Sequence, residues 1–119
     1  KDLGAISFKT FDNEKRRVNL FATLKAKKTN GKKPIILSGH TDVVPVSKSW
    51  STDPFKATIK GDKLFGRGSC DMKAGLASGI FAIFVLQKLG FIPNSTIMVQ
   101  SVVGEESGGC GTLANIVKG

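Results

Sequence analysis

Residues 72–89 are the feature that most constrains the fold. They are apolar on nearly every side of a helix, which predicts a helix packed against a sheet on more than one side. Gly90 and Pro93 supply its stop signal. Short apolar segments at residues 34–38 and 96–103 predict a buried strand on either side of it. A strand, a helix and a second strand in this order predict a parallel pair with a right-handed crossover.

The remaining segments predict further strands and an α/β class. Residues 17–25 alternate between polar and apolar side chains, as a half-buried strand does. Residues 57–66 predict a hairpin that turns at Gly61 and Asp62, and Asn30-Gly31 predicts another turn. With 119 residues, the chain is at most one domain.

Much of the excess positive charge of the chain lies in one loop. The formal net charge is +9, and five lysines lie between residues 25 and 33. This run is either a solvated loop tip or a surface that steers acidic substrates or meets an acidic partner. Because no aromatic side chains interleave to stack on bases, we expect no nucleic-acid partner.

Membrane association and disulfides are not expected either. The apolar stretch within residues 72–89 is shorter than the ~20 residues of a membrane span. No secretory-leader pattern is seen in the first residues of the sequence. Cys70 and Cys110 are far apart and lack the spacing of a structural zinc site. They are expected to be free thiols, so we expect a cytoplasmic protein.

Acidic side chains and the only histidine follow the predicted strands. In open α/β sheets, ligands bind beyond the carboxyl ends of the strands. His40 and Asp42 follow the first strand of the unit, Asp71 lies where the helix begins, and Glu105 and Glu106 follow the second strand. We therefore expect these side chains to converge on one rim of the sheet.

Each of these residues also has a purely structural explanation. His40 is either a structural histidine or a metal ligand whose second nitrogen is held by Asp42. Asp71 is either a helix N-cap or a functional acid. The Gly-x-Gly before it lacks the third glycine of a dinucleotide site. Glu105 and Glu106 are either solvated turn residues or a metal ligand beside a proton-transferring acid.

Four sequence blocks together resemble one enzyme family. In order, they are SGHTDVVP at 38–45, WSTDPF at 50–55, LFGRGSCDMKAG at 64–75 and GEESGGCGT at 104–112. The chain is thereby similar to the zinc-dependent aminoacylase and carboxypeptidase family, which includes acetylornithine deacetylase and succinyl-diaminopimelate desuccinylase. The resemblance implies an α/β, three-layer zinc-exopeptidase-like catalytic domain, with a mixed, largely parallel sheet flanked by helices.

The resemblance also implies a role for each site residue. His40 would bind one metal ion, with Asp42 orienting it, and Glu106 would bind the second metal ion. Asp71 would bridge two divalent ions, zinc or else cobalt, and the Asp71–Met72 peptide would be cis. Glu105 would be the general base.

The family has further ligands that have no counterpart in this sequence. No acid follows Glu106 and there is no second histidine, so each metal ion would have two protein ligands here. We therefore interpret residues 1–119 as an incomplete N-terminal portion of the catalytic domain, without the second domain and inactive alone. The parent would be a cytoplasmic homodimer that hydrolyses N-acyl amino acids. The alternatives are a di- or tripeptidase, a carboxypeptidase or a non-catalytic binding fragment.

Overall fold

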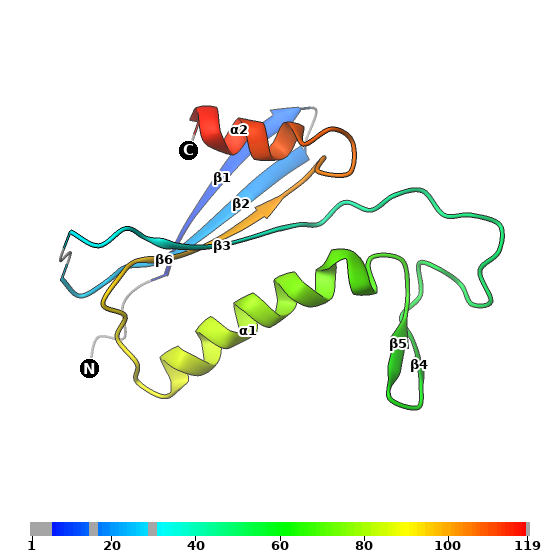
Figure 1. The fold of residues 1–119 in the computed structure, drawn as a ribbon, viewed down its shortest axis with the longest axis horizontal. Coiled ribbons are helices and arrows are strands. Elements are labelled where there is room, and N and C mark those ends of the chain that lie inside the picture. The colour runs from blue at the N-terminus through cyan, green and yellow to red at the C-terminus, as the bar shows by residue number, and fades with distance from the viewer. Residues whose placement is uncertain (1–5, 15–16, 29–30, 119) are drawn as a thin grey trace.

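A four-stranded sheet organises the chain. The computed structural model describes residues 6–14, 17–28 and 31–118. The sheet has the order β1-β2-β6-β3, formed by β1 (Ile6–Glu14), β2 (Arg17–Leu24), β6 (Ile97–Val102) and β3 (Ile35–His40) (Figure 1). The predicted strands at 17–25, 34–38 and 96–103 are therefore present, with ends that differ by one or two residues.

One of the three strand pairings is parallel. β1 pairs with β2 and β2 pairs with β6 in antiparallel fashion, whereas β3 and β6 run parallel, with His40 opposite Val102. Helix α1 (Ala74–Lys88) connects this pair in sequence, as the strand–helix–strand pattern predicts. The α/β class and the mixed sheet are thus confirmed, although two of the three pairings in the described part of this sheet are antiparallel, so this part is not largely parallel.

Helices cover both faces of the sheet. Alternate residues of a strand point to opposite faces, so Leu24 and Asn19 of β2 lie on opposite sides. Leu24 packs in the core with Ile83 of α1, together with Ile97 and Val99 of β6. On the other face, Asn19 is hydrogen-bonded to residues of α2 (Cys110–Lys118). Helix, sheet and helix form three layers.

The expectation that β3 is a buried central strand is wrong for this chain. Ile35 and Ile36 are 54% and 49% exposed. The physical reason is its position: β3 pairs with β6 on one side and is the edge of the four-stranded sheet among the described strands. Its apolar residues fit a central strand in composition, but composition does not determine strand order.

Helix α1 also packs on fewer sides than its sequence predicts. Among its residues, only Ile83 is buried. The outward face is apolar and exposed, with Phe81 63% and Phe84 49% accessible and their rings 6.0 Å apart. By length and composition alone, the helical segment Ser69–Lys88 could cross a membrane, with a mean hydropathy of 1.5, although core helices meet the same test.

A small hairpin lies apart from the main sheet. Strands β4 (Thr58–Lys60) and β5 (Lys63–Phe65) pair around Gly61 and Asp62, as predicted. Figure 1 shows this hairpin beyond the N-terminal end of α1. The turn predicted at Asn30-Gly31 falls partly on residue 30, which lies outside the described residues.

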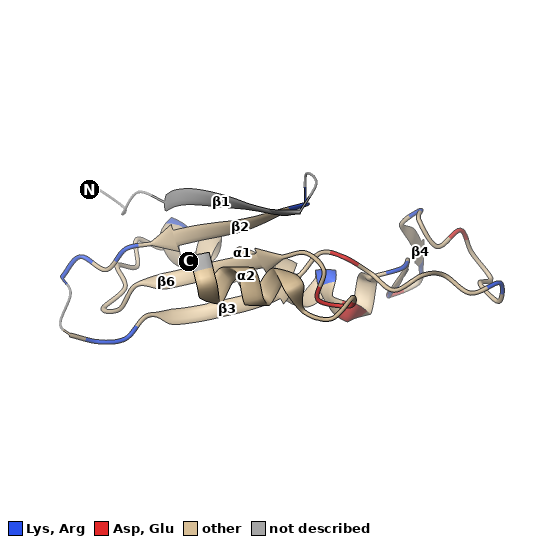
Figure 2. Ribbon diagram, turned by 90° about the horizontal axis from the view of Figure 1, so that it is seen from above, with Lys and Arg blue, Asp and Glu red and all other residues tan. Residues whose placement is uncertain are grey.

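Charged residues are separated along the molecule. Figure 2 shows lysine-rich loops at one end of the sheet and a group of acidic residues near the opposite end. The basic loop is therefore remote from the rim on which the acids gather.

The exposed face of α1 predicts self-association of the purified chain. Large contiguous apolar patches usually mark contact surfaces, so sedimentation velocity should show oligomers whose population grows with concentration. Phe81→Lys should shift the chain toward monomer, because it places a charge in the centre of that face. Ile59→Lys is the matched control, since Ile59 is 77% exposed on the separate hairpin. A concentration-independent monomer, or equal effects of both variants, would contradict this prediction.

Candidate metal centre

The parallel pairing of β3 and β6 places their carboxyl ends side by side. The backbone N–H of Thr41 donates to the Val102 carbonyl over 2.9 Å, and its hydroxyl donates to the same oxygen over 3.2 Å. His40 ends β3, and the turn after β6 carries Glu105 and Glu106. The loops that follow these strands therefore start at one rim, as the sequence pattern predicts.

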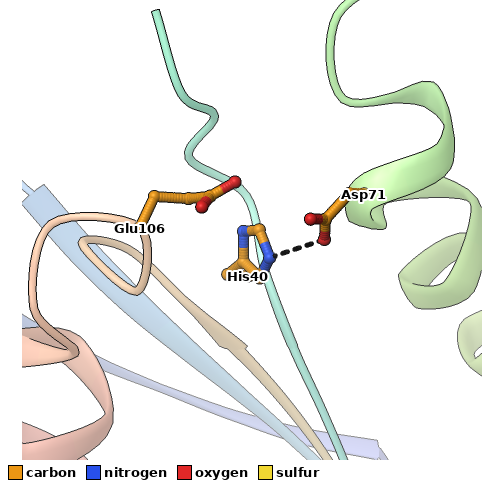
Figure 3. A group of neighbouring side chains, drawn as sticks. All are labelled: His40, Asp71 and Glu106. Atoms are coloured by element: carbon orange, nitrogen blue, oxygen red, sulfur yellow. Dashed lines mark hydrogen bonds and ion pairs between the residues drawn. The ribbon is translucent and has the colours of Figure 1, made fainter.

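Three side chains converge at this rim from separate segments. One ligand atom each of His40, Asp71 and Glu106 can be chosen so that all lie within 4.8 Å of one another. Figure 3 shows the two carboxylates approaching the imidazole from opposite sides. His40 is 5% exposed, whereas the side chain of Asp71 is 75% exposed. The cluster thus has a buried nitrogen donor and solvent-facing oxygen donors.

Both ring nitrogens of His40 face oxygen acceptors. Nδ1 lies 3.0 Å from the Asp42 carbonyl oxygen, and Nε2 lies 3.2 Å from Asp71 Oδ1 and 3.7 Å from Glu105 Oε2. Burial of the ring lowers its pKa, but these hydrogen bonds and the nearby negative charges outweigh burial, so the pKa of His40 is raised. With Nδ1–H donating to the carbonyl, the neutral ring keeps its free electron pair at Nε2, toward the acids.

Asp42 lies beside the histidine, as expected, but contacts it differently. The hydrogen bond to Nδ1 comes from its backbone carbonyl, and its carboxylate lies 3.7 Å from Nδ1. The carboxylate instead accepts the backbone N–H groups of Glu105, over 3.3 Å, and Glu106, over 3.1 Å. Burial alone would raise the pKa of Asp42, but these N–H groups favour the charged form, and the net pKa is lowered.

Asp71 is not a helix N-cap. It lies in the irregular helical turn η1 (Ser69–Lys73) with non-helical backbone angles, and the N-cap residues of η1 and α1 are Gly68 and Lys73. The regular helix begins at Ala74, and the Asp71–Met72 peptide is cis, as the resemblance implies. The carboxylate of Asp71 is therefore free to face His40.

Glu105 and Glu106 differ in their surroundings. Glu106 is half-buried and belongs to the cluster with His40 and Asp71. Glu105 is more exposed, and its carboxylate approaches Nε2 of His40 only to 3.7 Å. Both acids lie in a turn, so the turn interpretation holds for the backbone, while the side chain of Glu106 points into the cluster (Figure 3).

Lys73 holds two site segments together and was not singled out from the sequence. Its ammonium donates to the backbone carbonyl of Thr41, and so links the start of α1 to the loop after β3. Arg67 makes a similar link by donating to the Pro45 carbonyl over 3.2 Å. The only sequence signal for either residue is a basic side chain within the block at 64–75.

Cys70 and Cys110 do not form a disulfide. Both are free thiols, Cys70 exposed and Cys110 half-buried, as expected from their sequence positions.

The contacts of Asp42 predict a pH-dependent contribution to stability. Asp42→Asn should lower the free energy of unfolding at pH 7 by about 1–3 kcal/mol, because hydrogen bonds to a charged acceptor weaken. Since the folded pKa is depressed, this contribution is complete above the unfolded pKa of about 3.9. It is lost as the pH falls through the lower folded pKa. Urea denaturation between pH 7 and pH 2 measures it.

Asp62→Asn is the matched control, because Asp62 is exposed in the hairpin turn. The gap between wild type and Asp42→Asn should close in acid, whereas Asp62→Asn should show little loss at any pH. A gap that is independent of pH would show that the charge of Asp42 is not what anchors the turn.

Curated proteins of similar sequence include a deformylase and a desuccinylase. The chain is 40% identical over 103 residues to N-formyl-4-amino-5-aminomethyl-2-methylpyrimidine deformylase of Halalkalibacterium halodurans, covering 85% of this chain and 24% of that protein. It is 39% identical over 90 residues to succinyl-diaminopimelate desuccinylase of Gluconobacter oxydans, covering 76% and 22%. The chain thus spans about a quarter of the length of these relatives.

Solved structures agree in fold. Human carnosine dipeptidase 1 superposes with a TM-score of 0.76 at 26% identity, over 94% of this chain and 25% of that one. An M20 family metallo-carboxypeptidase from Sulfolobus solfataricus gives 0.73 at 29% identity, over 91% and 24%. Residues 36–119, which include every residue of the cluster, match the family described as Peptidase family M20/M25/M40. The chain belongs to Peptidase family M20/M25/M40.

Proposed function

We propose that the protein containing this chain hydrolyses the amide bond of N-acyl amino acids, in the manner of an acetylornithine deacetylase or a succinyl-diaminopimelate desuccinylase. The observation that carries this proposal is the cluster of His40, Asp71 and Glu106 within 4.8 Å, at the carboxyl ends of a parallel strand pair. The relative named succinyl-diaminopimelate desuccinylase supports the substrate class, and the relative named as a deformylase supports removal of an acyl group.

The donor set fits divalent metal ions. An imidazole nitrogen and carboxylate oxygens are ligands that zinc accepts, and cobalt binds similar donors. Nε2 of His40 is the available ring nitrogen, because Nδ1 is occupied by the Asp42 carbonyl. We propose two ions, with His40 and Asp71 serving one and Asp71 and Glu106 serving the other. Such ions, when bound, polarise the scissile carbonyl and make water more acidic.

Glu105 is the group proposed to move the proton. Its carboxylate is next to the cluster and outside the ligand set, so it is available to accept a proton from the attacking water. The same carboxyl group would then deliver that proton to the amine that leaves. Asp42 orients Glu105 and His40. Its carboxylate accepts the Glu105 N–H, and its backbone carbonyl accepts a hydrogen bond from Nδ1 of His40.

Peptide hydrolysis is the second candidate. Among the similar solved structures are a carnosine dipeptidase and a metallo-carboxypeptidase, and the same groups can cleave a peptide bond. A non-catalytic binding module is the alternative from a different class. Zinc titration distinguishes the two classes, because a binding module gives no reason for an ion to bind at Asp71.

The wider setting of the protein is also proposed. We propose that residues 1–119 are the N-terminal portion of a catalytic domain that continues in a longer, homodimeric protein. The coverage of about a quarter of each relative supports the longer protein. Two free thiols support a cytoplasmic location. Neither nucleic acid nor a membrane is proposed as a partner, and the lysine-rich loop is remote from the acidic rim (Figure 2).

Glu105→Gln tests the proposed role in proton transfer. In the full-length protein it should lower kcat on N-acetyl and N-succinyl amino acids by ~10²–10⁴-fold or more, because the glutamine side chain cannot accept the proton. Bound zinc, measured by atomic absorption, should stay unchanged. Glu106→Gln is the matched variant and should lose metal. Loss of zinc in Glu105→Gln equal to that in Glu106→Gln would mean that the two roles are exchanged.

The isolated 119-residue chain should bind zinc weakly and show no turnover. Catalytic zinc sites ordinarily have three protein ligands, and the proposed site offers two to each ion. The carboxylates also repel one another without a cation. Calorimetric zinc titration and an assay on N-acetyl amino acids check this expectation. Tight binding of two zinc ions together with turnover would show that the cluster is already complete.

A further inference from the structure

Asn19 is the most completely buried large side chain described in the molecule. It is 0% exposed and lies near the start of β2, on the sheet face that α2 covers. Burying an amide without hydrogen bonds is costly. Asn19 avoids that cost: Nδ2 donates to the Gly111 carbonyl over 2.8 Å and to Asn115 Oδ1 over 2.7 Å, and Oδ1 accepts the Val103 N–H over 3.0 Å. Both of its amino hydrogens and its carbonyl oxygen are used.

Two of these bonds join the ends of one turn. Val103 immediately precedes, and Gly111 immediately follows, residues 104–110, which contain Glu105 and Glu106. The two ends approach so closely that a Cβ added to Gly111 would lie 1.9 Å from the Val103 carbonyl oxygen. A side chain at 111 would therefore force the ends apart. Asn19 holds the ends together from the strand beneath.

The turn has two side-chain attachments, one from Asp42 and one from Asn19. Within it, the Gly109 N–H donates to the carbonyls of Gly104 and Glu105, both over 3.0 Å. Near its start, the Asp42 carboxylate accepts the N–H groups of Glu105 and Glu106. At its base, Asn19 binds the ends. Asp42 ties the acids to the strand of His40, whereas Asn19 ties the whole turn to β2.

We infer that Asn19 is a positioning residue for Glu105 and Glu106, acting by closing the base of their turn against β2. This inference rests on the proposed function, because it assigns a purpose to the placement of the two acids. Asn19 touches neither acid directly and is not a catalytic residue. Its effect is carried by the backbone from Val103 and Gly111 to the carboxylate of Glu106 in the cluster.

A merely structural role is the competing explanation, and Asn115 separates the two. Asn115 is 7% exposed, and its own Nδ2 has no hydrogen-bond partner in the described part of the chain. Asn115→Ala removes one bond of the same buried network but leaves the bonds of Asn19 to Val103 and Gly111. Asn19→Ala removes all three.

The experiment compares Asn19→Ala with Asn115→Ala in the full-length protein. The measurements are zinc affinity by chelator competition, kcat and KM, and the free energy of unfolding by urea. Asn19→Ala should weaken zinc binding by about 10–100-fold, as loss of groups that orient metal ligands does, and should lower kcat. Asn115→Ala should destabilise the fold but change zinc affinity less than about 3-fold, because the base of the turn stays closed. Equal effects on zinc affinity from both variants would overturn the inference.

Two further measurements test the inference if the Asn19→Ala protein does not fold. Asn19→Asp keeps the size and the acceptor for Val103 but places an oxygen against the Gly111 carbonyl, and it should weaken zinc binding by an intermediate factor. Zinc affinity equal to wild type in a folded Asn19→Asp would overturn the inference. In the wild type, the Val103 amide should exchange its hydrogen as slowly as the amides of β6. Fast exchange, typical of an open turn, would show that the base is not closed.

The outcomes also distinguish this inference from the proposed function. If Glu105→Gln abolishes turnover but Asn19→Ala binds zinc like Asn115→Ala, the function stands and the role of Asn19 falls. If no amide substrate is cleaved but Asn19→Ala alone weakens zinc binding, Asn19 still positions the ligand Glu106 and the proposed reaction falls.

Discussion

The parallel pairing of β3 with β6 is the constraint on which the site depends. Only a parallel pair brings two carboxyl ends to one edge, and the apolar helix α1 makes the required crossover. His40 is the last residue of β3, and the Glu105–Glu106 turn follows β6. The crossover helix starts near that edge, so η1, which precedes it and carries Asp71, lies there too. Three segments distant in sequence thereby supply one cluster.

Electrostatic balance then explains how so many acids coexist beside one histidine. The negative charge of Asp42 is stabilised by two backbone N–H groups, while Asp71 and Glu105 lie within ion-pair distance of the imidazole. The raised pKa of His40 reflects these neighbours. Solvent exposure of Asp71 and Glu105 screens what remains of the repulsion. A divalent cation fits the same balance, because it replaces the proton as the positive partner of the carboxylates.

Much of the local structure follows from sequence, and the errors have physical causes. The alternation of residues 17–25, the apolar run at residues 96–103 and the turn at Gly61 predicted their elements, because those signals are local. The rim site was predictable because strand ends determine which loops meet. Strand order and helix cover are not local, so the exposed edge at Ile35 and the exposed face of α1 were missed. The buried polar contacts of Asn19 were missed because an alternating strand gives no sign that an inward polar residue meets backbone from a distant turn.

Because η1 leads directly into α1, the packing of α1 in the core also affects the distances between donor atoms in the site. Asp71 lies just before a helix whose only buried residue is Ile83, packed against Leu24 and Val99. A helix moves largely as a rigid rod, so the volume of the side chains beneath Ile83 sets how far the rod stands from the sheet. That distance bears on the position of η1, which leads directly into the rod and carries Asp71. Spacing between the donor atoms is therefore partly a property of core packing and not of the ligand side chains alone.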